Sequence, residues 1–344
     1  MVLIFGLFAV VWWGGAAVNV PKSARWGVIF LIYIAVLGIQ FVFPIAHPLR
    51  VISGGGSVFW LSVGVTFGVI WAYRAGLNWL RDRAAPATET AQVGPFSDAE
   101  LTRYARHIVL REVGGMGQTK LKDARVLVIG AGGLGSPALM YLAAAGVGTI
   151  GVVDDDDVDS SNLQRQVIHF DKDIGEPKVH SAAEKMREIN PFVTVKPYRR
   201  RLDETSATAL FADYDLVLDG TDNFATRYLI NQTCVAQGIP LISGALTQWE
   251  GQLSVFDPKR KTPCYQCIFP EAPAADLAPN CAEAGVMGPL PGIIGSMMAL
   301  EAVKLISGAG QPLLGEMLIF DGLYGETRKI GLKPRADCPI CGGK

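Results

Sequence analysis

Three long apolar runs without a charged residue lie in the first 80 residues of the chain. They cover residues 2–18, 26–46 and 57–73, and tryptophans lie in or beside each run. A helix needs about 20 apolar residues to cross a bilayer, with about 17 as the lower limit. The pattern therefore predicts a transmembrane segment of about three helices within residues 1–80.

The charges that flank these runs predict an orientation. Lys22 and Arg25 lie between the first and second runs, and three arginines closely follow the third, whereas only His47 and Arg50 lie between the second and third. Because positive loops stay in the cytoplasm, everything after residue 83 is expected there. The first run could instead be a signal peptide, but no basic region precedes it.

A change of composition separates this segment from the rest of the chain. Residues 81–96 are small, polar and contain prolines, which is typical of a linker. Ser97 and Glu100 then fit a capping box, and Phe96 and Leu101 fit the accompanying hydrophobic staple. A helix is therefore expected to begin directly after Ser97.

In residues 97–344, apolar runs typical of strands alternate with segments of helical periodicity. Strands are expected at 125–130, 149–154, 194–199, 215–220 and 240–245, and helices at 137–145, 177–189, 204–211 and 224–237. Such alternation indicates βαβ units. After Gly244 the segments 251–258 and 315–333 look like antiparallel strands, with an apolar helix over 293–306 between them. The predicted fold is α/β: a Rossmann-like, mainly parallel sheet that continues into antiparallel strands.

Charge and cysteine content exclude some functions. The formal net charge is −1 and the basic residues are scattered, so no broad basic face for nucleic acid is expected. All six cysteines come after residue 230. In a cytoplasmic domain they stay reduced, so metal binding or catalysis is expected rather than disulfides.

A glycine-rich turn follows the first predicted strand. Gly130, Gly132 and Gly135 have the spacing of a dinucleotide-binding loop, and Asp154 ends the next strand. Glycines let a phosphate approach the backbone, and the helix N-terminus presents free amides to it. The carboxylate of Asp154 can accept hydrogen bonds from ribose. Taken alone, this stretch favours NAD or FAD.

Charged residues after the later strands change that interpretation. Arg165 and Lys178 follow the second strand, and Asp219 and Asp222 follow the fourth. A triphosphate needs cations to offset its charge and a carboxylate to hold Mg²⁺. Each residue alone has a simpler role as a surface charge or a helix cap. Their recurrence at successive strand ends favours ATP over a dinucleotide.

These residues belong to motifs that carry a resemblance. The motifs "RYARHIVL", "VLVIGAGGLGSPALMYLAAAGVG", "SNLQRQ", "GEPKV", "DGTDNFATRY", "CYQC", "CAEAGV" and "CPICG" run in order from about Ser97 to Gly342. This set resembles the MoeB/ThiF/HesA family, which is related to ubiquitin-activating enzymes, and its MoeB branch most closely. Family members adenylate the C-terminal glycine of a small ubiquitin-like sulfur carrier and release pyrophosphate.

The resemblance implies partners as well as a reaction. The carrier is expected to be MoaD-like, from molybdenum cofactor biosynthesis, with a ThiS-like carrier from thiamine biosynthesis as the alternative. A separate sulfur donor, such as a cysteine desulfurase or sulfurtransferase, is expected because no sulfurtransferase domain follows Cys341. Arg106 corresponds to an arginine that reaches into the partner subunit's active site, which implies a homodimer.

The resemblance also assigns site residues. Arg106, Arg165, Lys178, Asp222 and Cys281 are the expected catalytic residues, with Asp222 on Mg²⁺. The expected ATP-binding residues are Gly130, Gly132, Gly133, Gly135, Asp154, Ser161, Asn162, Arg165, Lys178, Asp222 and Asn223. Cys281 lies in a loop whose cysteine forms a thioester or persulfide in some relatives; an inert thiol is the alternative.

The remaining cysteines suggest a metal site. Two CxxC pairs supply four thiolates, and four thiolates without an open position suit structural, tetrahedral Zn²⁺. The ligands are expected to be Cys264, Cys267, Cys338 and Cys341. Unmetallated thiols and redox pairs are the alternatives. Cys234 lies in a helical pattern and is expected in the core.

Three other functions compete with adenylation. They are an NAD-dependent oxidoreductase, a non-catalytic membrane adaptor and a tRNA-threonylcarbamoyladenosine dehydratase. The oxidoreductase leaves the SNLQR, GTDN and CxxC segments unexplained. The histidines, among them His169, have no companion at metal-ligand spacing, so no role is assigned to them. In the acidic run 154–157, only Asp154 is expected to have a function.

Overall fold

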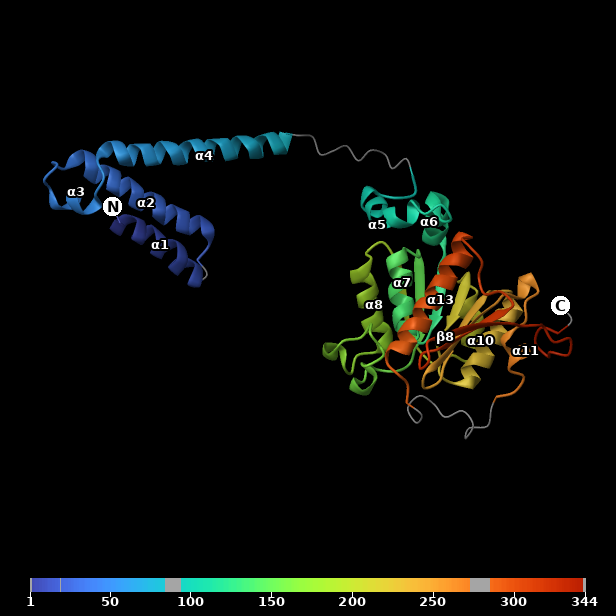
Figure 1. Cartoon of the computed structure of the whole chain (residues 1–344). Coiled ribbons are helices and arrows are strands. Elements are labelled where there is room, and N and C mark those ends of the chain that lie inside the picture. The colour runs from blue at the N-terminus through green and yellow to red at the C-terminus, as the bar shows by residue number, and fades with distance from the viewer. Residues whose placement is uncertain (1, 19, 84–93, 273–284, 343–344) are drawn as a thin grey trace. The chain divides into compact units, whose positions relative to one another are not determined.

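The computed structural model describes residues 2–18, 20–83, 94–272 and 285–342 (Figure 1). The chain divides into two compact units, residues 1–93 and 94–344. The described secondary-structure elements of the first unit are all helices. Its helices are α1 (Val2–Ala17), α2 (Lys22–Val42), α3 (Pro48–Ser53) and α4 (Ser57–Arg83).

Polar contacts join the helices of the first unit at one end. The Gln40 Nε2 atom of α2 donates to the Ser53 Oγ atom of α3 at 2.8 Å. The fully buried Trp60 of α4 donates through Nε1 to the Gly54 carbonyl, also at 2.8 Å. By length and composition, Lys22–Val42 and Ser57–Leu77 could each cross a membrane, and Leu3–Ala17 is a shorter apolar helix. The predicted apolar helices are therefore present, and their insertion into a bilayer stays a prediction.

The second unit is built on one sheet. Its strands are β1 (Arg125–Ile129), β2 (Thr149–Asp154), β3 (Thr194–Arg199), β4 (Leu216–Asp219), β5 (Leu241–Leu246), β6 (Glu250–Phe256), β7 (Glu316–Asp321) and β8 (Glu326–Gly331). They lie in the order β3-β2-β1-β4-β5-β6-β7-β8. Strands β1 to β5 pair in parallel, and β6, β7 and β8 pair antiparallel. The predicted mixed sheet is confirmed.

Helices cover both faces of this sheet. The helices are α5 (Asp98–Ile108), α6 (Gly114–Asp123), α7 (Gly135–Ala145), α8 (Lys178–Ile189), α9 (Glu204–Phe211), α10 (Phe224–Gln237), α11 (Tyr265–Ile268) and α13 (Pro289–Ser307), with short 3₁₀ turns at Ser160–Asn162, Asp171–Asp173 and Pro258–Arg260. Figure 1 shows α7, α8 and α13 side by side. Helices α9 and α10 contribute to the core of the other face.

Strand β1 shows how the two cores are divided. Val126 and Val128 belong to the core under α7, α8 and α13, whereas Leu127 and Ile129 belong to the core under α9 and α10. Successive side chains of a strand point to opposite faces, so a strand covered on both faces is apolar throughout. The apolar α13 is also long enough to cross a membrane, but half of its apolar window is buried in this unit. We therefore identify α13 as a core helix, as expected for 293–306.

The start of α5 bears on two local predictions and confirms one of them. Ser97 and Glu100 form the predicted capping box. The predicted staple between Phe96 and Leu101 stays a prediction: Leu101 is 44% exposed, and the Phe96 ring packs edge-on against Tyr104 at 6.1 Å between centroids. Tyr104 is buried between the helix and the core, so it offers Phe96 the larger apolar surface.

Candidate active site

Three neighbouring strands bring the predicted site residues to one edge of the sheet. Strands β2, β1 and β4 are adjacent and parallel, so their carboxyl ends and the loops that follow them lie together. In open α/β sheets this edge is where ligands bind. The glycine loop, defined here as residues 130–135, leaves β1 at this edge and enters α7.

The glycines of this loop have different structural reasons. Gly130 has a φ of +92°, which favours glycine. A Cβ atom on Gly135 would lie 1.9 Å from the Gly130 carbonyl oxygen, so the tight turn excludes a side chain. A Cβ on Gly132 would meet only the Gln166 Nε2 atom, at 3.5 Å. The backbone at Gly132 therefore borders open space.

The first turn of α7 has no side-chain cap. In the part of the chain that the structure describes, the Gly132 and Gly133 amides have no hydrogen-bond acceptor. A helix N-terminus with free amides favours an anion. The glycine loop thus offers what a phosphate group requires, although no side chain of the protein occupies that position.

Asp154 ends β2 and contacts the glycine loop. Its Oδ2 atom accepts the Ala131 amide at 2.7 Å, and its Oδ1 atom accepts the Asp156 amide at 2.9 Å. Burial raises the pKa of Asp154, opposed by the charge of Lys178 and by the two amides. Each carboxylate oxygen keeps a lone pair beyond these bonds, so the predicted ribose contact is compatible with this arrangement.

The two predicted cations lie near the loop. Lys178 is the first residue of α8 and is 4% exposed, and its Nζ atom contacts the Asp156 Oδ2 atom at 2.7 Å. The Arg165 Cγ atom lies 3.6 Å from the position of a Cβ on Gly133. Its guanidinium donates to the Asn162 Oδ1 atom at 2.7 Å. Asp156 lies on the loop surface, as expected, with its side chain 67% exposed, and it is also the counter-ion of the buried Lys178.

Other predicted binding residues are engaged locally. The Ser161 hydroxyl donates to Asp159 at 2.5 Å. The Asn223 side chain caps α10 by accepting the Thr226 amide at 2.9 Å. Asp222 is exposed and has no partner among the described residues, so its carboxylate is available to a ligand or a metal. The roles of these residues toward ATP and Mg²⁺ stay predictions.

A buried ion pair supports the loop that carries Asp222. Arg227 and Asp219 are 5% and 1% exposed, and the Arg227 Nη1 atom contacts the Asp219 Oδ2 atom at 3.1 Å. Arg227 also donates to the Thr221 and Gly244 carbonyls. This guanidinium therefore joins the ends of β4 and β5 beneath Asp222. The sequence predicts Asp219 at the end of a strand, but hydrophobic periodicity does not identify Arg227 as its partner.

Two predicted catalytic residues are not brought to this edge by the described structure. Arg106 lies in the last turn of α5 and has no partner among the described residues, so its role across a dimer stays a prediction. Cys281 lies outside the described residues, and its reactivity is untested. Cys234 is 1% exposed, as expected for a core residue.

A buried orphan atom tests whether the site suits a ligand. Gln166 is 5% exposed, and its Oε1 atom has no hydrogen-bond partner within the described chain. Its amide lies beside Gly132. A buried polar atom without a partner is costly, so a ligand with a donor group would stabilise it. This orphan acceptor therefore fits a donor group of a ligand, such as a hydroxyl or an amine of a nucleoside, whereas the free amides of the glycine loop fit its phosphates.

The four expected metal ligands form one cluster. The Sγ atoms of Cys264, Cys267, Cys338 and Cys341 all lie within 4.8 Å of one another. Cys264 to Cys338 is 3.7 Å, Cys264 to Cys267 is 3.9 Å and Cys267 to Cys341 is 3.3 Å. A tetrahedron with Zn–S bonds of about 2.3 Å has edges of about 3.8 Å. The geometry is thus compatible with zinc, and the distances exclude disulfides.

The environment of the cluster acts differently on its thiols: burial raises the pKa of Cys264 and of Cys341, whereas the pKa of Cys338 is lowered. Burial raises the pKa of the Cys338 thiol, but backbone amides of Cys341 and Ile340 bring it down to about 7. The Arg335 amide donates to the Cys267 Sγ atom at 3.4 Å, and the Asn231 side chain donates to Cys264 at 3.8 Å. Such N–H···S contacts orient metal ligands. The cluster joins two segments that are 74 residues apart in sequence.

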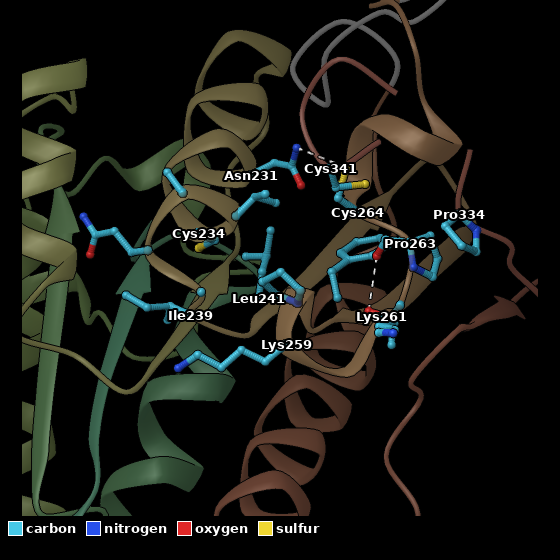
Figure 2. Close-up of a pocket in the computed structure, with 17 residues that line it drawn as sticks. Asn231, Cys234, Ile239, Leu241, Lys259, Lys261, Pro263, Cys264, Pro334 and Cys341 are labelled. Carbon is cyan, nitrogen blue, oxygen red and sulfur yellow. Dashed lines mark hydrogen bonds between the residues drawn. The ribbon is translucent and has the colours of Figure 1, made fainter. Parts of the chain in front are cut away.

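A cavity of about 510 Å³ lies beside this cluster and not at the glycine loop. Figure 2 shows Cys264 and Cys341 on one wall, with Cys234 and Leu241 nearby. Leu241 begins β5, so the cavity lies at the amino end of a parallel strand. The glycine loop lies at the opposite, carboxyl ends of the parallel strands. The cavity is therefore separate from the candidate active site.

One polar chain near the glycine loop escaped sequence reasoning. His169, for which no role was expected, is 3% exposed and contacts both the Ala131 carbonyl and the Ser181 hydroxyl. Ser181 in turn contacts Asp173. Spacing could not reveal this chain, because its members come from a loop, a 3₁₀ turn and α8.

Comparison with known proteins agrees with this geometry. The ThiF family model matches residues 104–340. The chain is 48% identical over 243 residues to the SAMP-activating enzyme E1 of Haloferax volcanii, covering 71% of this chain and 89% of that protein. It is 47% identical over 251 residues to the sulfur carrier protein adenylyltransferase of Thermus thermophilus, covering 72% and 93%.

A solved structure shares the fold. The ATP complex of Escherichia coli MccB matches with a TM-score of 0.58 at 23% identity, covering 66% of this chain and 69% of that one. The sheet order, the glycine loop and the strand-end residues described above all lie within the region matched by the family model. The chain therefore belongs to the ThiF family, which includes the MoeB-type adenylyltransferases.

Proposed function

We propose that this chain is an adenylyltransferase that activates the C-terminal glycine of a small ubiquitin-like sulfur carrier. The observation that carries the proposal is the meeting of free glycine-loop amides with Arg165 and Lys178 at one sheet edge. The Thermus relative is named for the same activity. An NAD-dependent oxidoreductase would not need these cations, and the family membership supports the adenylyltransferase instead.

The proposed reaction needs no general base. The carrier's carboxylate oxygen attacks the α-phosphorus of ATP, the bond from that phosphorus to the bridging oxygen breaks, and pyrophosphate leaves with its electron pair. The main barrier is repulsion between an anion and a polyphosphate. Arg165, Lys178 and the loop amides lower it by placing positive charge where negative charge develops. Mg²⁺ on Asp222 would neutralise further phosphate charge.

Lys178 must exchange partners in this proposal. Its ammonium contacts Asp156, whose side chain is 67% exposed, in the structure without nucleotide. A phosphate oxygen would replace the carboxylate as its acceptor, and Asp156 would return to solvent. The exposure of Asp156 makes this exchange cheap, because water takes over the hydrogen bonds that the carboxylate loses.

The finer assignments extend this proposal. The carrier is MoaD-like, with ThiS-like as the alternative, and the sulfur comes from a separate donor. Arg106, which is exposed in the last turn of α5, acts across a homodimer. Zinc on the cysteine cluster is structural because all four positions are filled by protein. Helices α1, α2 and α4 anchor the chain in a membrane, with the enzyme on the cytoplasmic side.

Variants of the two charged residues test the activity. Arg165→Ala and Asp222→Ala should fold but lose carrier-dependent ATP–pyrophosphate exchange, each by about 10²-fold or more, because each removes charge stabilisation from the transition state. Arg125→Ala is the matched control. Arg125 pairs with Asp215 at the amino end of β1, far along the same strand from the glycine loop, and both side chains are 49% exposed.

The exchange assay is run with a MoaD-like and a ThiS-like carrier separately, and the adenylate is detected by mass. Wild-type exchange with only one carrier identifies the substrate. Wild-type exchange that survives in both the Arg165 and the Asp222 variant contradicts the proposed site. Loss of exchange in the Arg125 control as well would show that the effect is not local.

A further inference from the structure

Four groups behind the glycine loop form a continuous polar chain. The His169 Nε2 atom lies 3.0 Å from the Ala131 carbonyl oxygen, and its Nδ1 atom lies 2.8 Å from the Ser181 Oγ atom. The Ser181 Oγ atom lies 3.0 Å from the Asp173 Oδ2 atom. His169, Ser181 and Asp173 are 3%, 4% and 6% exposed. These contacts therefore connect buried side chains, from Asp173 through Ser181 and His169, to the backbone of the glycine loop at Ala131.

The position of the proton on His169 follows from its partners. A carbonyl oxygen only accepts, so Nε2 carries a proton and donates to Ala131. Burial lowers the pKa of His169, opposed by the Ala131 carbonyl, and the nearby Lys178 charge lowers it further while Asp173 raises it. The Ser181 hydroxyl donates to the Asp173 Oδ2 atom, so its oxygen is held in place beside Nδ1 and helps to fix the ring. The Ala131 carbonyl, and not Ser181, therefore determines that Nε2 carries the proton.

The contact with Ala131 sets the direction of a free amide. The Ala131 carbonyl and the Gly132 amide belong to one planar, trans peptide unit, so they point in opposite directions. A carbonyl held toward His169 therefore aims the Gly132 amide away from the core, where it has no acceptor among the described residues. Glycine 132 has no Cβ to oppose rotation of this peptide unit, so an external hold is needed.

The preceding peptide unit is held from the other side. The Ala131 amide donates to the Asp154 Oδ2 atom at 2.7 Å. Ala131 is thus fixed at its nitrogen by Asp154 of β2 and at its carbonyl by His169 at 3.0 Å, with a longer contact of 3.4 Å from the buried Ser136 hydroxyl. Both contacts are made by protein atoms alone, so neither requires a nucleotide. A loop that protein contacts already order loses less conformational entropy when a ligand binds to it.

We propose that His169 is a positioning residue, oriented by Ser181 and Asp173, that holds the Ala131 carbonyl and thereby aims the Gly132 amide at a phosphate of the bound nucleotide. The proposal rests on the adenylyltransferase function above only in naming the nucleotide as ATP. It assigns His169 no contact with substrate. Its effect is on binding, through the backbone of the glycine loop.

Three substitutions in the full chain separate positioning from packing. His169→Phe keeps a buried planar ring but cannot donate to Ala131. His169→Gln restores a donor on a side chain of similar reach. Ser181→Ala leaves the imidazole and removes the hydroxyl that links its Nδ1 atom to Asp173. Circular dichroism and thermal unfolding report whether each variant folds, and Ser181→Ala, the smallest change, carries the test if His169→Phe does not fold.

Direct ATP binding by calorimetry is the first measurement. The dissociation constant for ATP should rise about tenfold in His169→Phe, as expected for one lost hydrogen bond in a closed site, and should return toward wild type in His169→Gln. In the exchange assay the change should appear in KM for ATP, with kcat altered by less than about threefold, because the amide contacts phosphate in both ground and transition states.

Amide hydrogen exchange of residues 130–136 without nucleotide is the second measurement. Exchange at Ala131 should be faster in His169→Phe and Ser181→Ala than in wild type. The proposal would be overturned if His169→Phe and Ser181→Ala both kept the wild-type ATP affinity and the wild-type rate of amide hydrogen exchange at Ala131. A wild-type protein that binds ATP but shows no carrier-dependent pyrophosphate exchange would defeat the proposed function and leave the positioning role standing.

Discussion

At the scale of single residues, buried polar atoms decide how the candidate site is built. Asp154 and His169 each hold one end of Ala131, and Arg227 holds the loop that carries Asp222. Each polar group is buried and would be costly without its partner. Consequently two residues with no assigned contact to the nucleotide, His169 and Arg227, help to place the groups that bind it in our proposal.

The buried imidazole of His169 also predicts a pH dependence of stability. Its pKa in the folded state lies below the ordinary value of 6.5, first because burial disfavours the charged ring. As pH falls below 6.5, the unfolded chain takes up a proton that the folded chain resists, so the free energy of unfolding falls. This contribution is fully present above pH 6.5.

Thermal unfolding at about pH 5.5 and about pH 7.5 measures this effect. The drop in midpoint between the two conditions should be larger for wild type than for His169→Gln, whose side chain does not titrate. Equal drops in the two proteins would show that His169 contributes nothing to the acid sensitivity.

At the scale of elements, the turn from β1 into α7 links packing to binding. Gly135 and Gly132 have the same chemistry but opposite surroundings. A Cβ on Gly135 would collide with the Gly130 carbonyl, whereas a Cβ on Gly132 would meet a single side-chain atom at ordinary contact distance. The turn therefore separates a glycine needed by the fold from one that leaves room for a ligand.

Alanine at each position should give opposite results. Gly135→Ala should lower the free energy of unfolding by about 1–3 kcal/mol or more, because backbone must move to admit the methyl group. Gly132→Ala should unfold close to the wild-type temperature yet bind ATP weakly, because the methyl group enters the space beside the free amides. Thermal unfolding and ATP calorimetry on both variants decide the matter. A stable Gly132→Ala protein with normal ATP affinity would place the phosphates elsewhere.

At the scale of the whole molecule, the chain consists of two units with different physical character. The two large cores of the second unit lie entirely within residues 121–332, and none of their members comes from the first unit. The first unit instead exposes many large apolar side chains, including Leu31 at 68% and Trp71 at 73%. Exposed apolar surface of this extent is stable in lipid and unstable in water.

Removal of the first unit tests the proposed division of roles. Residues 94–344 expressed alone should be soluble and should retain carrier-dependent pyrophosphate exchange, because their cores are complete. The full chain should sediment with membranes, resist extraction at alkaline pH and require detergent. Fractionation followed by the exchange assay measures both. A full chain that stays in the soluble fraction would contradict the membrane proposal, and an inactive truncated protein would contradict the independence of the two units.

The sequence by itself determined most of the elements and their kind. Hydrophobic periodicity located the strands, the four helices from α7 to α10, the core helix α13 and three apolar N-terminal helices, because burial on one face or two leaves a direct trace in residue order. It gave no signal for the helices α3, α6 and α11. The glycine loop, the CxxC pairs and the strand-end charges were recognisable for a related reason: each depends on residue types at fixed short spacing, or on motifs in a fixed order.

Only the tertiary structure decided which distant residues meet. It brought Cys264 to Cys338, Lys178 to Asp156, and Asp219 to Arg227, and it showed that Phe96 packs on Tyr104. It also revealed the contact of His169 with Ala131. These contacts are set by strand order and helix packing, which bring together groups that are unrelated in sequence, so no local pattern could predict them.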